Sequence, residues 1–188
     1  MIVIGGFGYL IPLVYIPTYA QFYLNVSKSH GALAISLFNF ASTIGRILAG
    51  IFADKFFGRF NSFMGSFILS GISIIVLWGN STSFAILIAF SITFGIIVGG
   101  VISLLPVVVA DLFGLDVLAN MMGICFSGYF FGNVLGPPIG GYFLDKFQNN
   151  GAINWLPTIA LSASLMMLAG VMGIGIKIIE KKKKLNNL

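Results

Sequence analysis

Long apolar runs separated by short polar stretches dominate this chain. Cutting it at the polar stretches leaves six runs, at residues 2–24, 31–53, 62–78, 84–110, 117–144 and 155–176. Each run is continuously apolar rather than alternating, and about 20 residues of helix cross the hydrocarbon core of a bilayer. The pattern therefore predicts an all-α membrane protein with six transmembrane helices.

Composition and charge support this class. Hydrophobic residues make up 58% of the chain and charged residues 8%, and the mean hydropathy is +1.03. Soluble domains carry about 25% charged residues. The net charge of +5 comes from cations at the ends of the runs and in a terminal lysine cluster. That distribution indicates contact with a lipid bilayer and no nucleic-acid partner. We expect a six-helix bundle at 1–178 and a basic cytoplasmic tail at 179–188.

The distribution of Lys and Arg between alternate polar segments predicts the orientation. One side of the membrane holds seven of these residues and the other side holds two, Lys28 and Lys146. The seven are Lys55, Arg59, Lys177 and Lys181 to Lys184. By the positive-inside rule the richer side is cytoplasmic, so both termini are expected there. We expect a plasma-membrane location, and no cleaved signal peptide because the first residues lack a basic segment.

Arg46 interrupts the second apolar run, eight residues before Asp54. At about 1.5 Å per helical residue it lies about 12 Å inside the charged end, where a cation facing lipid would be costly. Helical spacing places Asn39, Ser42 and Thr43 on the same side as Arg46. The opposite side is expected to carry an apolar set: Phe38, Phe40, Ile44, Ile47 and Ile51.

This polar stripe predicts a surface that faces the bundle interior or an aqueous cavity. An arginine there suits a carboxylate, which it can bind through paired charge-assisted hydrogen bonds. The alternative is that Arg46 pairs with a group inside the protein and contributes to stability. The acids of the chain all lie at the ends of runs: Asp54, Asp111, Asp116, Asp145 and Glu180. The partner of Arg46 is therefore a ligand, backbone, water or another chain, and an anionic small molecule is the leading candidate.

Glycines recur where helices are expected to approach closely. Gly128, Gly132, Gly136 and Gly140 form a four-residue repeat on one helix face. Such a ridge supports either tight static packing or a sliding contact. Pro137 and Pro138 follow Gly136, and we expect these three residues to break the fifth helix and form a hinge.

Intramembrane catalysis finds no support in the residues. Paired acids, a Ser/His dyad or metal ligands would be needed within the apolar runs. The chain has one cysteine, Cys125, in an apolar run and one histidine, His30, between runs. We expect no enzyme, no metal site and no cofactor.

The turn after the second run carries the most specific motif, Gly50-Ile-Phe-Ala-Asp54-Lys55-Phe-Phe-Gly58-Arg59. It resembles the cytoplasmic-loop motif of the major facilitator superfamily, with one extra phenylalanine between Lys55 and Gly58. In that fold the motif joins the second and third spans of each six-helix half, which is its position here.

Further stretches resemble the monocarboxylate porter family, particularly its fungal members. They begin at Asn39, Gly99 and Leu135, together with Tyr15-Ile-Pro-Thr-Tyr19-Ala in the first run. The resemblance implies the C-terminal half of the fold, spans seven to twelve. It also implies that Arg46 binds the substrate carboxylate and that Ser103 lies near the cavity. Animal members tie proton-coupled symport to an aspartate four residues before that arginine, where this chain has Ser42.

Two functional hypotheses follow. The first is the C-terminal half of an alternating-access secondary transporter for monocarboxylate-like organic anions, with Arg46 as the carboxylate anchor and Asn39, Ser42 and Ser103 beside it. Its partner would be a missing N-terminal half or a second copy. The second is a truncated transporter fragment with no transport activity of its own. A homomeric channel stays open, although no selectivity-filter pattern supports it.

Overall fold

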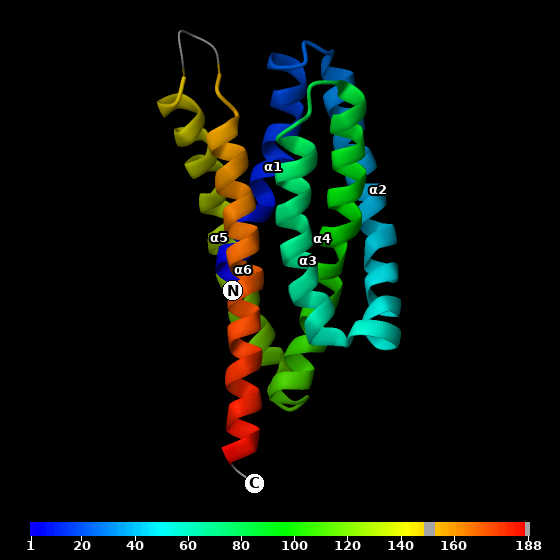
Figure 1. Ribbon diagram of the computed structural model, residues 1–188, viewed down its shortest axis with the longest axis vertical. Coiled ribbons are helices and arrows are strands. Elements are labelled where there is room, and N and C mark those ends of the chain that lie inside the picture. The colour runs from blue at the N-terminus through cyan, green and yellow to red at the C-terminus, as the bar shows by residue number, and fades with distance from the viewer. Residues whose placement is uncertain (149–152, 187–188) are drawn as a thin grey trace.

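The structure, a computed structural model, describes residues 1–148 and 153–186 and consists of long helices (Figure 1). In chain order they are α1 (Ile2–Phe22), α2 (Lys28–Phe52), α3 (Arg59–Ser73), α4 (Phe84–Phe113), α5 (Leu118–Lys146) and α6 (Leu156–Asn186). Two π-helical turns, η1 (Ala53–Phe57) and η2 (Ile74–Trp78), extend α2 and α3. The described residues contain no strand, and six helical segments are long and apolar enough to cross a membrane. The prediction of a multi-pass, all-α membrane protein is confirmed.

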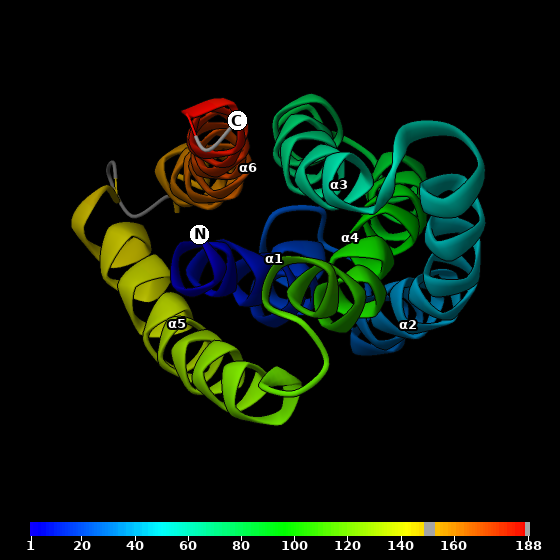
Figure 2. The ribbon, with the colours of Figure 1, turned by 90° about the horizontal axis from the view of Figure 1, so that it is seen from below.

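Seen from one end, the helices divide into two groups (Figure 2). Helices α5, α1, α4 and α2 form an arc, and α3 and α6 lie together on one side of it. α1 contacts α5, α6 and α2, and α4 contacts α2 and α3. α5 packs mainly on α1, so most of its surface is left uncovered.

Glycines allow two pairs of helices to approach almost backbone to backbone. On α5, a Cβ atom at Gly136 would lie 2.6 Å from the carbonyl oxygen of Phe7 in α1, and Gly132 lies equally tightly on the backbone at Val3. On α4, a Cβ atom at Gly95 would lie 2.6 Å from the carbonyl oxygen of Phe38 in α2. Such contacts tolerate no side chain, so the repeat on α5 forms a tightly packed seam.

The turn between the second and third spans differs from the loop that we expected. We predicted a loop over residues 54–61, but α2 continues through η1 and α3 begins at Arg59, so Gly58 alone separates them. A π turn closes its hydrogen bonds over one more residue than an α-helical turn and so accommodates the extra phenylalanine. Gly58 has φ +78°, a conformation that glycine adopts without steric cost.

Other helix ends also extend beyond the apolar runs. α2 begins at Lys28 and includes His30, which we expected in a loop. α4 continues to Phe113 and ends at Gly114 with φ +87°, so Asp111 is helical rather than part of an acidic loop. Polar residues outside the hydrocarbon core do not end a helix unless a residue such as glycine breaks it. For the same reason α6 continues past the expected bundle limit at 178.

The expected break in α5 is absent. The helix runs without interruption from Leu118 to Lys146 and includes both Pro137 and Pro138. The hydroxyl of Tyr15 in α1 donates a hydrogen bond to the carbonyl oxygen of Pro137 at 2.8 Å. Pro137 and Pro138 remove the backbone donors for the carbonyls of Asn133 and Val134, so the Tyr15 bond attaches α5 to α1 beside the prolines and does not replace a lost helical bond. A hinge role for Gly136, Pro137 and Pro138 stays a prediction.

The seam between α1 and α5 predicts different effects on the free energy of unfolding for two glycine substitutions in α5. Gly132→Ala should lower the free energy of unfolding by about 1–3 kcal/mol, because the new methyl group would overlap the backbone of α1. Gly123→Ala is the matched control, since a Cβ atom there has nothing within 4 Å, and it should be neutral or slightly stabilising. Thermal unfolding in detergent, followed by circular dichroism, measures both. Equal effects would contradict the seam.

Candidate functional site

Three polar side chains form an exposed stripe along α2. Asn39, Thr43 and Arg46 are separated by four and three residues and are all exposed. Farther round the same helix, the side chains of Phe40 and Ile47 are 67% and 64% exposed. α2 therefore presents one polar surface and one apolar surface outside its contacts, and a bilayer suits the apolar one.

Ser42 and Phe38 do not lie where the sequence analysis placed them. Ser42 is 4% exposed and Phe38 is 1% exposed. Both lie in the seam with α4, where Gly95 and Gly99 contact their backbones. Each residue turns a helix by about 100°. By that measure Ser42 is the member of the predicted polar stripe that lies nearest this seam, and Phe38 lies at the centre of the buried face. The assignment of Phe38 to the opposite, apolar surface was wrong.

The guanidinium of Arg46 has no carboxylate within 4 Å in the described part of the chain. The side chains of Asn39 and Thr43 each donate a hydrogen bond to a carbonyl of their own helix. Asn39 Nδ2 donates to the Ile35 carbonyl and Thr43 Oγ1 donates to the Asn39 carbonyl, both at 3.1 Å. The acceptor oxygen of Asn39 and the donors of Arg46 remain available on the exposed surface. This arrangement can bind an anion.

Polar groups on two other helices lie close to this surface and were missed in the sequence. Tyr9 of α1 lines a cavity together with Ile102 of α4, which is about one helical turn past Gly99, the residue that packs on the backbone of Arg46. The ring of Tyr129 in α5 lies 5.9 Å from that of Tyr9, centroid to centroid. Asn133 Oδ1, one turn farther along α5, is buried and has no hydrogen-bond partner among the described residues. An asparagine within an apolar run was a signal for Asn133, whereas nothing distinguished these two tyrosines from the others.

A small cavity lies beside these tyrosines. Its volume is about 140 Å³, and it lies between α1, α3, α4 and α5. Its lining includes Tyr9, Tyr129, Ile102 and Phe126. Ser103, the next residue on α4, is half-buried, and its hydroxyl contacts the Gly100 carbonyl of its own helix at 3.5 Å. The described residues contain no cluster of three or more side chains that could hold a metal ion.

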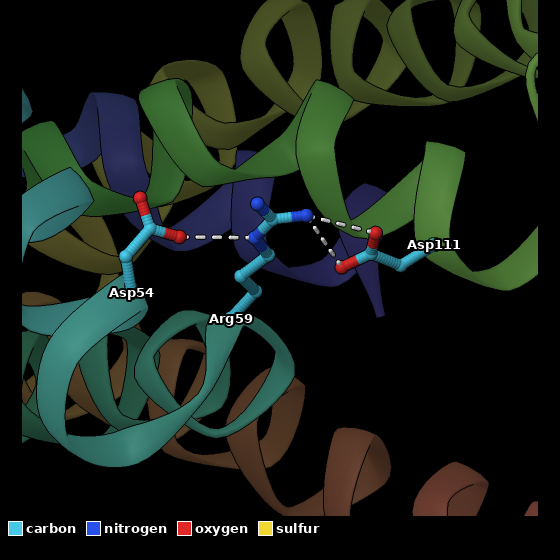
Figure 3. Close-up of polar contacts among 3 residues, drawn as sticks. All are labelled: Asp54, Arg59 and Asp111. Carbon is cyan, nitrogen blue, oxygen red and sulfur yellow. Dashed lines mark hydrogen bonds and ion pairs between the residues drawn. The ribbon is translucent and has the colours of Figure 1, made fainter.

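A second cluster lies at the end of the bundle where α2 turns into α3, and it includes Asp54 and Arg59 of the turn motif. Arg59 Nε lies 3.0 Å from Asp54 Oδ1, and Arg59 Nη1 lies 3.1 Å from Asp111 Oδ1 (Figure 3). Arg59 thus joins η1 to the last turn of α4. Sequence reasoning missed Asp111 because it placed this residue in a loop, although a carboxylate at the end of an adjacent span was a usable signal.

The remaining motif residues have different surroundings. Lys55 is exposed and has no carboxylate within 4 Å among the described residues. Gly50 is half-buried, and a Cβ atom there would have nothing within 4 Å, so its packing does not explain the glycine. Gly58 supplies the turn that brings Arg59 back toward Asp54.

The two ion pairs of Arg59 predict that this side chain stabilises the C-terminal end of α4. Arg59→Gln should speed amide hydrogen exchange over residues 107–113, because it removes the contact between Arg59 and Asp111. Asp111→Asn should have a similar effect, and combining the two should add little. Lys55→Gln removes a nearby cation that forms no ion pair and serves as the control. Unchanged exchange in Arg59→Gln would contradict this role.

Comparisons with known proteins agree with the helical membrane fold. A family model described as Major Facilitator Superfamily matches residues 1–187. The chain is 30% identical over 174 residues to an aspyridones efflux protein of Emericella nidulans, covering 92% of this chain and 34% of that protein. It is 33% identical to an MFS-type transporter of Aspergillus niger, covering 89% and 37%. It is 28% identical to monocarboxylate transporter 12 of Xenopus laevis, covering 95% and 38%.

Proposed function

The chain belongs to the major facilitator superfamily, and we propose that it forms one half of a secondary transporter for small organic anions. The chain spans between about a third and two fifths of the length of the curated relatives it matches. Those relatives include efflux proteins and a monocarboxylate transporter, so the family and the relatives support transport rather than catalysis. The motif order supports the C-terminal half, spans seven to twelve.

The exposed guanidinium of Arg46 is the observation that carries the proposal. It lies on the uncovered arc of helices and has no acidic partner in the described residues. A substrate carboxylate would supply the missing charge through two charge-assisted hydrogen bonds. Asn39 and Thr43 flank the bound anion, and Ser103 lies farther inside on α4. Ser42, buried in the seam, contributes by holding α2 against α4.

Alternating access requires a second six-helix bundle against this surface. We infer that a missing N-terminal half or a second copy of the chain covers the arc of α1, α2, α4 and α5. The Gly136-Pro137-Pro138 segment of α5 would then bend as the two bundles rock. We propose that the side of the membrane with seven Lys and Arg residues faces the cytoplasm, with both termini on that side, and that the membrane is the plasma membrane.

A truncated fragment with no transport of its own is the alternative. The coverage of the relatives supports it, because a single half lines only one wall of a translocation path. In this alternative Arg46 can still bind a carboxylate, but the chain by itself does not carry out a transport cycle.

Uptake by vesicles that contain only this chain tests the transport proposal. We expect labelled monocarboxylate to accumulate above empty vesicles, and Arg46→Ala to reduce the rate at least about tenfold, since a hydrogen bond to a charged group contributes about 1.5–3 kcal/mol. Arg46→Lys should retain part of the activity. Lys28→Gln, which removes a cation far from this surface, is the control.

Uptake no greater than that of empty vesicles would reject autonomous transport and support the fragment. Carboxylate-dependent uptake that is equally fast in wild type and Arg46→Ala would reject the anchor. The two outcomes are therefore distinguishable.

A further inference from the structure

An apolar groove runs between α2, α3 and α4 and is separate from the Arg46 surface. Its volume is about 350 Å³, and Ile96 and Ile97 of α4 form its floor. On α2 it is lined by Gly45, Leu48 and Phe52. Helical geometry places these residues about 120° round α2 from Arg46, on the other flank of the seam with α4. Nothing in the proposed transport site uses this groove.

The groove faces the bilayer. Leu48, Phe52 and Leu69 on its walls are 37%, 48% and 53% exposed, although they are apolar. On α3 its wall extends from Asn61 to Leu69, which is about 12 Å at 1.5 Å per residue. The groove therefore begins at the end of the bundle that carries the charged turn motif and extends toward the hydrocarbon region. Its length and lining fit part of an acyl chain.

Two polar features at the inner end point to a headgroup above that chain. Ser62 lines the groove, and its hydroxyl oxygen is buried beneath the lining without a hydrogen-bond partner among the described residues. Asn61 also lines the groove, and its Oδ1 accepts a hydrogen bond from Lys177 Nζ of α6. No carboxylate lies within 4 Å of Lys177 in the described part of the chain.

The charge at this end is predominantly positive. Asp54 and Asp111 are both paired with Arg59. Two other cations lie near the groove: Lys177, which contacts Asn61 in its lining, and Lys55, which lies in the chain between the lining residues Phe52 and Phe57. The four lysines at 181–184 follow Lys177 within two helical turns of the sequence. A basic segment beside a membrane span attracts anionic headgroups.

We propose that this groove is a binding site for one anionic phospholipid of the leaflet on the lysine-rich side. An acyl chain lies along Gly45, Gly65 and Ile97, the glycerol-ester region reaches Ser62, and the phosphate lies at Lys177. This site is independent of the substrate that the protein carries.

Gly65 allows a direct test, because a Cβ atom there has nothing within 4 Å and a larger side chain would enter the groove rather than the bundle. The full chain is purified from bilayers that contain equal amounts of phosphatidylserine and phosphatidylcholine, and retained lipid is counted by native mass spectrometry. Wild type should retain one phospholipid, mostly phosphatidylserine. Gly65→Leu should lose it. Gly175→Leu, at another open glycine outside the groove, should retain it.

Two milder variants test the headgroup contacts and do not depend on the folding of Gly65→Leu. Lys177→Gln should lower the preference for phosphatidylserine over phosphatidylcholine about fivefold, because a lysine at the membrane surface contributes about 1 kcal/mol toward an anionic lipid. Ser62→Ala should lower total retention. The proposal is overturned if Gly65→Leu retains as much lipid as Gly175→Leu, or if the lipid preference is the same in Lys177→Gln and wild type. Retention of free phosphate in place of lipid would also overturn it.

Discussion

The close approach of α2 and α4 is the constraint on which both proposed binding surfaces of this bundle depend. Gly95 and Gly99 allow the two backbones to meet, and this contact fixes the rotation of α2 about its axis. With Phe38 and Ser42 in the seam, Arg46 must lie on one flank and the apolar groove on the other. A rotation of α2 by one residue would place the guanidinium against lipid or against the backbone of α4. The seam between α1 and α5 fixes Tyr9 and Tyr129 in the same way.

The ion pairs of Arg59 connect this geometry to the inner end of the bundle. Arg59 contacts Asp54 after α2 and Asp111 at the end of α4, the same two helices that form the seam. The chain reverses at Gly58 to make these contacts possible. One side chain thus joins the turn motif to the helix pair that carries Arg46. Both ion pairs are exposed at the surface, and a displacement of α4 relative to α2 would change the distances that Arg59 spans.

The fold class and the spans were predictable because apolar runs of membrane length admit few alternatives. The motif at Gly50 to Arg59 and the depth of Arg46 also identified the family and the candidate anchor from local pattern alone. The errors arose where tertiary contacts override local rules. Pro137 and Pro138 suggested a break, but α5 continues through both residues and packs closely on α1 there. Asp111 and Ser42 were misplaced because helix ends and buried faces are decided by neighbouring helices, which no single run of sequence specifies.

If the Arg46 stripe faces water or substrate rather than lipid, cysteines placed along it should be accessible from the aqueous phase. In a Cys125→Ser background, single cysteines at Asn39, Thr43, Phe40 and Ile47 would be exposed to a membrane-impermeant maleimide. All four positions are exposed on α2, so only the surroundings of each surface should distinguish them. We predict that cysteines at 39 and 43 react and that those at 40 and 47 do not. Equal protection of all four, or reaction only at 40 and 47, would contradict this orientation of the stripe.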